Sequence, residues 1–267
     1  MKYIITIFTL IYTQILIAGI NQAPPPFDYK DGKAVWVDFK TAYYELEYDV
    51  KKKSAWATTT INFEALESGY PIFDSVQKPE RVWIDGVETD AALVNLPEGV
   101  SRVRIVQSSI EPGSHTLKIR TRVDNGTKFR GVGRSRNVSS GFFIKDLKDR
   151  LFLEKYVPSN YEYDQYQMTF NVQIIGSKKS HNIFANGEVE ELGKNKFQVT
   201  YPESYTSSAV LFHLVPLNKF KRTYFDYTSI DGRKIPVIIY SSYWIRSWRM
   251  YYKSRRVLRE LEEDYGP

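Results

Sequence analysis

Apolar and polar residues alternate along most of the chain in short runs that turn residues separate. Residues 43–50 and 115–123 alternate almost without a break, and residues 55–63 are rich in threonine and isoleucine. A period of two is typical of strands with one buried face. Asp85-Gly86 has the composition of a type I′ hairpin turn. Over residues 34–217 the pattern predicts a mainly β domain of packed antiparallel sheets, as a β-sandwich or a curved saddle.

Several shorter runs extend this pattern. Further strands are expected at residues 35–39, 81–84, 100–106, 141–144, 151–153, 165–175, 182–185, 196–201 and 209–215. Residues 218–242 continue as connecting strands that lead out of the β domain.

The hydrophobic period changes near Trp244. One apolar stripe at helical spacing consists of Trp244, Trp248, Tyr251, Arg255, Leu258, Leu261 and Tyr265. We therefore predict a C-terminal amphipathic helix over residues 243–267, with the helix-stop pair Gly266-Pro267 at its end. Its first half is basic, which we interpret as a solvated face; contact with an anionic membrane or a nucleic acid is the alternative.

The N-terminal residues have the pattern of an export signal. A basic start at Lys2 precedes an apolar run over residues 3–18, so we expect a signal peptide at residues 1–18. The run is shorter than the ~20 residues that span a bilayer, and an uncleaved anchor is the alternative, which would be the protein's only membrane contact. Residues 19–33, with three consecutive prolines, are a stiff linker. We expect an exported protein that is periplasmic, in the cell envelope or secreted.

Composition excludes several kinds of chemistry. The 267 residues include no cysteine, which excludes disulfides, thiolate metal sites and cysteine nucleophiles. The formal net charge is +6, and the basic residues are scattered over separate turns. Nucleic-acid binders gather basic residues on one face, so we expect no nucleic-acid partner.

The sequence offers no catalytic motif. The three histidines lie in separate strand-like runs, and none belongs to a His-Glu-x-x-His sequence. Nucleophile elbows and phosphate-binding loops are missing as well. Carboxylates cluster in sequence at Asp146, Asp149, Glu154, Glu162 and Asp164. A carboxylate pair could hydrolyse glycosides, but sequence spacing does not give the separation in space that this reaction needs. We assign no catalytic and no metal-binding residue.

The order of several motifs resembles the N-terminal β-saddle domain of aminopeptidase N type zinc peptidases, continuing into the start of their catalytic domain. The resembling segments are residues 44–50, 58–63, 83–86, 113–119, 152–158, 168–174, 185–188 and 258–267. The resemblance implies a β-saddle domain, truncated where the catalytic domain opens. Residues 159–167 depart from the family pattern, because they are shorter and rich in tyrosine.

The same resemblance suggests where a substrate would bind. The saddle domain of this family lends one side chain to the pocket for the substrate's free amine, and the matching position here falls at Glu154 or Lys155. A lysine would repel an ammonium group, so Glu154 is the candidate substrate-binding residue. The family's zinc motif would lie beyond residue 267, so we expect no cofactor in this chain and zinc only in a catalytic domain.

Two functions remain open. The first is a non-catalytic N-terminal domain of an exported zinc metallo-aminopeptidase, whose partners would be a peptidase catalytic domain or a peptide substrate. The second is a free-standing envelope module that binds carbohydrate or protein through some of its 20 tyrosines and 5 tryptophans. Exposed aromatic residues would favour the second function. We expect most of them to be packed in the core, because aromatic residues favour strands.

Overall fold

The structure is a computed structural model that describes residues 23–97, 102–142, 152–241 and 244–266. The expected signal at residues 1–18 lies outside the described residues. The chain divides into two compact units, which we call the β unit (residues up to Leu214) and the hairpin–helix unit (Val215–Pro267). No helix among the described residues is long and apolar enough to cross a membrane.

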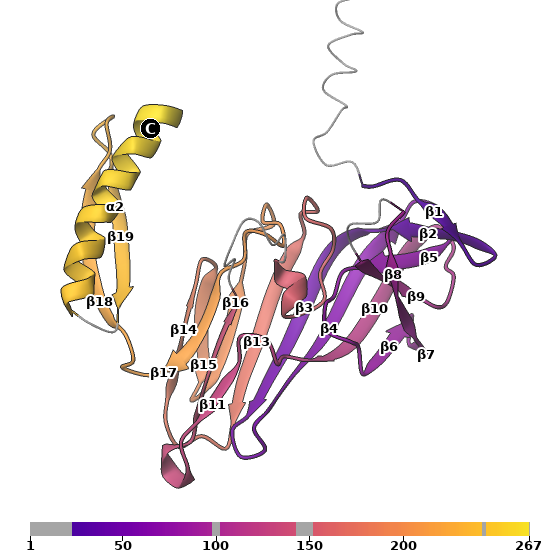
Figure 1. Ribbon diagram of the computed structural model, residues 1–267, viewed down its shortest axis with the longest axis horizontal. Coiled ribbons are helices and arrows are strands. Elements are labelled where there is room, and N and C mark those ends of the chain that lie inside the picture. The colour runs from indigo at the N-terminus through magenta and orange to yellow at the C-terminus, as the bar shows by residue number, and fades with distance from the viewer. Residues whose placement is uncertain (1–22, 98–101, 143–151, 242–243, 267) are drawn as a thin grey trace, which may run out of the picture. The chain divides into compact units, whose positions relative to one another are not determined.

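The β unit is built on an eight-stranded sheet whose strands lie side by side in the order β15-β16-β13-β3-β4-β10-β6-β7 (Figure 1). Their bounds are β3 (Asp38–Asp49), β4 (Ser54–Ala65), β6 (Arg81–Ile84), β7 (Val87–Thr89), β10 (Gly113–Arg122), β13 (Gln167–Ile175), β15 (Glu188–Gly193) and β16 (Lys196–Thr200). Six of the seven neighbouring pairs are antiparallel, as the sequence pattern predicts, while β3 and β13 run parallel.

Two smaller sheets accompany this one. The five-stranded sheet, in the order β1-β2-β5-β9-β8, contains β1 (Phe27–Tyr29), β2 (Gly32–Trp36), β5 (Tyr70–Phe73), β8 (Ala91–Asn95) and β9 (Arg102–Val106). The four-stranded sheet, in the order β11-β12-β17-β14, contains β11 (Lys128–Arg130), β12 (Asn137–Phe142), β14 (His181–Ala185) and β17 (Phe212–Pro216). Strands β2 and β5 are also parallel. Two short 3₁₀ helices are η1 (Gly133–Ser135) and η2 (Leu153–Lys155).

The main core is aromatic and joins the eight-stranded sheet to the four-stranded sheet. Phe170 on β13 packs edge-on against Tyr44 on β3, with ring centroids 4.6 Å apart. Its other neighbours include Phe212 on β17 and Phe142 on β12, whose own rings are 4.9 Å apart. All four side chains are at most 1% exposed. Burial of this much aromatic area gives the β unit a core of its own.

Local predictions hold in one case and fail in another. Asp85 and Gly86 have φ angles of 50° and 82°, and they connect the antiparallel strands β6 and β7, which confirms the type I′ turn. The strand expected at residues 151–153 is wrong in the part that is described. Phe152 is not in a strand, and Leu153 begins η2, because the Glu154 carboxylate accepts a hydrogen bond from the Phe152 backbone N–H and closes a local turn.

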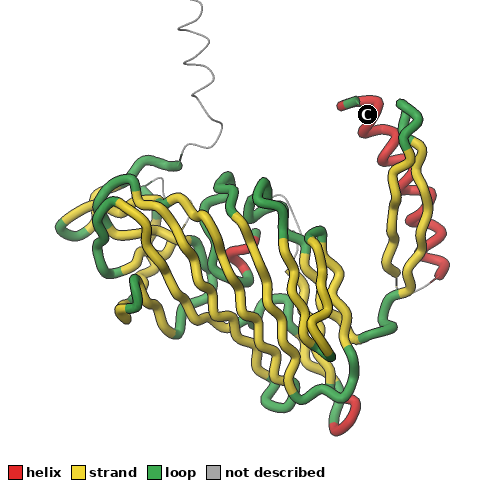
Figure 2. Tube along the Cα trace, turned by 180° about the vertical axis from the view of Figure 1, so that it is seen from behind, coloured by secondary structure: helices red, strands yellow, loops and turns green. Residues whose placement is uncertain are grey.

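The hairpin–helix unit consists of the hairpin β18 (Lys221–Thr228) and β19 (Lys234–Ser241), followed by helix α2 (Trp244–Tyr265) (Figure 2). The Phe225 and Tyr251 rings meet at 4.6 Å, and the Tyr227 hydroxyl donates to Glu262 at 2.7 Å. The helix is present as predicted, but its apolar stripe is only partly covered. Leu258 is half-buried, whereas Trp248 is 63% exposed.

Candidate functional site

A cavity of about 290 Å³ surrounds Glu154 in the β unit. Its wall is formed by β2, the segment after β5, the ends of β8 and β9, η2 and the turn that follows it. The lining residues are Pro24, Trp36, Asp74, Leu96, Val103, Phe152, Glu154, Asn160, Tyr161, Glu162, Tyr163 and Ser207. Aromatic rings therefore enclose three carboxyl groups, and such a concave apolar site with a few polar groups is typical of a ligand pocket.

Glu154 is held by its own 3₁₀ turn. The side chain is 4% exposed, and one oxygen accepts a hydrogen bond of 2.7 Å from the Phe152 backbone N–H. Its carbonyl accepts another from the Val76 N–H at 2.9 Å, which ties η2 to the segment after β5. Burial raises the pKa of Glu154 above its ordinary value. Lys155, the other residue to which the resemblance points, does not line the cavity.

Asp74, which is half-buried, is the second carboxyl group of the site. Its backbone exchanges two hydrogen bonds with Ser159, at 2.8 and 2.9 Å, which fixes it opposite the turn after η2. Burial raises the pKa of Asp74 to about 8, and the negative charge of Glu154 adds to this effect. Near neutral pH the cavity thus holds one carboxyl group as a protonated acid, and a positively charged ligand would favour its ionised form.

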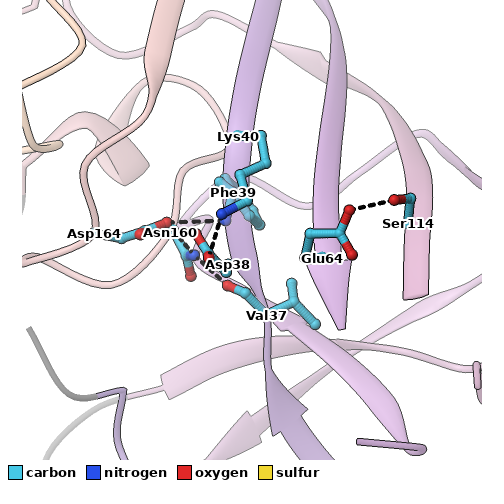
Figure 3. A network of polar contacts seen from close by, with 8 residues as sticks. All are labelled: Val37, Asp38, Phe39, Lys40, Glu64, Ser114, Asn160 and Asp164. Atoms are coloured by element: carbon cyan, nitrogen blue, oxygen red, sulfur yellow. Dashed lines mark hydrogen bonds and ion pairs between the residues drawn. The ribbon is translucent and has the colours of Figure 1, made fainter. Parts of the chain in front are cut away.

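A polar network joins Asn160 and Asp164 to the start of β3 (Figure 3). It fixes the turn between these two residues, which carries Tyr161, Glu162 and Tyr163. The Asn160 side chain donates from one nitrogen to the Val37 carbonyl at 2.7 Å and to the Asp164 carboxylate at 2.6 Å. The same carboxylate accepts from the Phe39 backbone N–H at 3.2 Å. Because Val37 and Phe39 flank the start of β3, the network anchors this wall of the cavity to the main sheet.

Asp164 lies behind the cavity wall and does not line it. Burial raises the pKa of Asp164 to about 7, against the lowering effect of its hydrogen bond from Asn160. The Asp164 carboxyl group therefore does not contact the cavity but holds the turn that forms part of its wall.

Two buried donors of the cavity have no partner among the described residues. These are the Trp36 indole Nε1 and the Ser207 hydroxyl, whose residue is 2% exposed. Buried polar atoms are nearly always hydrogen-bonded, so these two donors are unusual among the residues that line the cavity. Together, the free donors and the carboxyl groups suit a ligand that has both an amine and a carbonyl oxygen.

The structure brings together only part of the predicted carboxylate cluster. Glu154 and Glu162 both line the cavity, and Asp146 and Asp149 lie outside the described residues. Sequence reasoning missed Asp74, Trp36 and Ser207, which reach the cavity from distant parts of the chain. The sequence pattern predicted one strand at residues 35–39, where β2 ends at Trp36 and β3 begins at Asp38. It predicted no strand at β5, which precedes Asp74.

The histidines are structural in the two cases for which contacts are described. The His115 ring bonds the Asp85 carboxylate at 2.7 Å and the Glu111 carbonyl at 2.8 Å. The His181 ring accepts from the Val138 N–H and contacts the Asn195 side-chain oxygen. Within the described residues, no group of three His, Asp or Glu side chains is close enough to hold a metal ion. These residues therefore do not fit a zinc site.

The chain has a fold similar to that of the N-terminal region of M1 zinc metallopeptidases. Leukotriene A4 hydrolase from yeast, solved with bestatin, matches 70% of this chain with a TM-score of 0.52 and 12% identity. The native enzyme from Saccharomyces cerevisiae matches 70% of the chain with a TM-score of 0.51, also at 12% identity. A variant of a two-domain M1 zinc metallopeptidase, solved with L-arginine, matches 86% of the chain with a TM-score of 0.50 and 13% identity.

The likeness is one of fold. The matches cover 29%, 30% and 54% of those three chains, so this chain spans less than two thirds of each. No model of a known protein family matches the sequence, and no curated protein matches it.

Proposed function

We propose that the chain is the non-catalytic N-terminal domain of an exported aminopeptidase-like zinc metallopeptidase, which docks on a catalytic domain and forms one wall of its substrate site. The observation that carries this proposal is the extent of the fold match. Residues 1–214 are about 80% of the chain, so a match over 86% must include part of the hairpin–helix unit as well as the β unit. A β-sandwich of unrelated function would have no reason to share that second unit.

The exposed side chains of the hairpin–helix unit support the docking role. Apolar and aromatic residues of α2 remain exposed on both sides of the face that packs on the hairpin: Trp248 and Tyr252 on one side, and Met250, Val257 and Leu261 on the other. A helix normally buries such residues. In the proposal, the catalytic domain covers both flanks.

The Glu154 cavity supplies the substrate-binding role. The ionised carboxylates of Glu154 and Asp74 would hold the ammonium group of a peptide's first residue. The free donors of Trp36 and Ser207 would bind a carbonyl oxygen, and the rings of Phe152 and Tyr161 would pack against the first side chain. Because the pKa of Asp74 is about 8, amine binding would release a proton from it, and affinity should rise with pH up to that value.

Zinc, in this proposal, belongs to the catalytic domain. The described residues of this chain gather no set of metal ligands, and the zinc-binding motif of the resembling family has no counterpart in the sequence. The chain alone should release nothing from aminoacyl substrates when zinc is supplied. Zinc-dependent turnover that survives repurification of the isolated chain would contradict this expectation.

The test uses the protein purified from the envelope fraction of its own cells, with any polypeptide to which it is joined or bound. We expect it to release leucine from leucine p-nitroanilide. Glu154→Gln keeps the side-chain shape and removes the charge, so it should raise KM about tenfold and leave kcat nearly unchanged. Glu67→Gln, at an exposed position outside the cavity, is the matched control and should change neither.

Two outcomes would contradict the proposal. The first is recovery of the chain as a separate polypeptide without peptidase activity. The second is an unchanged KM in Glu154→Gln, which would contradict the claim that this chain binds the substrate through Glu154.

A further inference from the structure

The outer face of the eight-stranded sheet carries a second groove, of about 350 Å³, which the Glu154 cavity does not include. It crosses strands β10, β4, β3, β13 and β16 toward the end of β3 and β10 and the start of β4 and β16. The lining residues with polar or aromatic side chains that carry the argument are Glu45, Glu47, Trp56, Arg120, Gln173 and Lys196. The opposite face of the same strands packs on the aromatic core.

Strand register places these side chains in two parallel rows. Arg120, Thr58, Glu45 and Asn171 are successive cross-strand partners and form the first row. Trp56, Glu47, Gln173 and Lys196 form the second in the same way. Neighbouring strands are about 4.8 Å apart, so each row presents a hydrogen-bonding group at that interval. An extended ligand that lies across the strands would meet one group per step.

Glu45 and Glu47 have no role in the fold that the structure identifies. Neither carboxylate makes a hydrogen bond or an ion pair with another described residue. They lie two positions apart on one face of a central strand, where like charges repel and reduce stability. The Gln173 side chain likewise has no partner among the described residues. All three side chains are exposed, so both carboxylates and the amide are free to bind a ligand in the groove.

Trp56 has a fixed position at the end of the second row. The guanidinium carbons of Arg120 and Arg122 lie 4.9 and 5.3 Å from its ring centroid. Arg120 is itself held by an ion pair with Glu80 at 2.8 Å. These contacts restrict the orientation of the half-buried ring, which lines the groove beside Arg120.

The charges of the groove cancel. Glu45 and Glu47 contribute two negative charges, and Arg120 and Lys196 contribute two positive ones. A strongly charged polymer would meet as much repulsion as attraction here. A neutral ligand with many hydroxyl groups can donate to the carboxylates and accept from the amide, the guanidinium and the ammonium group.

We propose that this groove binds a neutral oligosaccharide, with one sugar ring against Trp56 and with hydroxyl groups donating to Glu45 and Glu47. A peptide fits the groove less well. The backbone groups of the central strands already pair with their neighbours, so no strand can be added at this face. An extended peptide is recognised through pockets that receive every second side chain, and the two polar rows provide no series of apolar pockets of this kind.

The test measures binding by isothermal titration calorimetry to the full chain, produced in a host that exports it. The probes are the hexasaccharides of β-1,4-glucose, α-1,4-glucose and β-1,4-N-acetylglucosamine. We expect at least one to bind with a Kd below about 1 mM. The double variant Glu45→Gln/Glu47→Gln keeps the side-chain shapes and should weaken binding at least about tenfold.

The matched control is Glu188→Gln, an exposed glutamate on β15 of the same sheet that does not line the groove. It should bind the sugar as the wild type does, and both variants should keep the wild-type melting temperature. The proposal is overturned if none of the three sugars binds, if the double variant binds normally, or if the control weakens binding equally. Preferential binding of a neutral hexapeptide that depends on Glu45 and Glu47 would also overturn it. None of these outcomes bears on the peptidase proposal, which depends on a different cavity.

Discussion

The β unit and the hairpin–helix unit differ in how much of their apolar surface they bury. The β unit has an extended core of side chains at or near zero exposure, among them Phe170 and Tyr44. In the hairpin–helix unit, the buried apolar side chains among those described are Val215, Tyr227 and Ile239. Small units need a sufficient core, a metal or a partner to be stable. The comparison indicates that the β unit folds independently, whereas the hairpin–helix unit needs a further surface.

The largest expected effect comes from truncating the core of the β unit. Phe170→Ala removes the ring at the centre of the aromatic cluster and should lower the free energy of unfolding by about 3–5 kcal/mol. The matched substitution in the other unit, Phe225→Ala, should leave the β-unit transition unchanged. Urea denaturation followed by circular dichroism measures both. Equal losses for the two variants would show that the units unfold together.

A pH dependence should also belong to the β unit. The pKa values of Asp74 and Asp164 are raised to about 8 and about 7, so the folded state keeps protons that the unfolded chain loses near pH 4. The stability from the protonated forms is fully present below about pH 4 and is lost as the pH rises through 7 to 8. The β unit should therefore melt at a higher temperature at about pH 5.5 than at about pH 8.5.

Asp164→Asn tests this assignment. The amide oxygen can still accept from the Phe39 N–H and from Asn160, while the titrating group is gone. The difference in melting temperature between the two pH values should become smaller. An unchanged difference would show that other groups cause the pH dependence.

A smaller, local effect is expected in the hairpin–helix unit. Glu262 accepts hydrogen bonds from the Tyr227 hydroxyl at 2.7 Å and from the Ile230 N–H at 3.1 Å, and so joins the helix to the hairpin turn. Glu262→Ala should speed amide hydrogen exchange in β18 and α2 by roughly five- to tenfold. Exchange in β3 and β13 should not change. Faster exchange throughout the β unit would contradict the independence of the two units.

The smallest effect on stability should follow from the largest deletion. Removal of residues 217–267 takes away the hairpin and helix but leaves β17 complete. The melting temperature of the β unit should stay within about 2 °C, and solubility should increase because exposed residues such as Trp248 are lost. If the shortened protein is unfolded by circular dichroism, the hairpin–helix unit belongs to the core of the β unit.

Strands were predictable where one face is buried. Along β3 and β10, alternate side chains such as Tyr44 and Leu117 enter the core while their neighbours face outward, so the sequence has a clear period of two. Side chains alternate in the same way in parallel and antiparallel strands. The sequence pattern therefore could not show that β3 pairs with β13 in parallel. The apolar residues near Phe152 also suit a strand, and only the hydrogen bond from its N–H to Glu154 decides for a 3₁₀ turn.

The candidate site was predictable only through Glu154, to which the resemblance points. Asp74 reaches the same cavity because its backbone pairs with Ser159, a contact between distant segments that no local pattern encodes. The free donors of Trp36 and Ser207 are defined by the lack of a described partner, which only three-dimensional packing can reveal.

The parallel pairing of β3 and β13 also affects how the β unit can fold. Thr41 pairs with Gln167, 126 positions later, and the pairing continues to Asp49 and Ile175. During synthesis from the N-terminus, β4 can pair with β3 early and β10 can pair with β4, but the other side of β3 must wait for β13. Until then a long strand presents open backbone groups to other chains. A late pairing therefore lies inside the finished sheet, and it closes a long loop. Such non-local closure favours slow folding and makes aggregation before β13 arrives the main hazard for this chain.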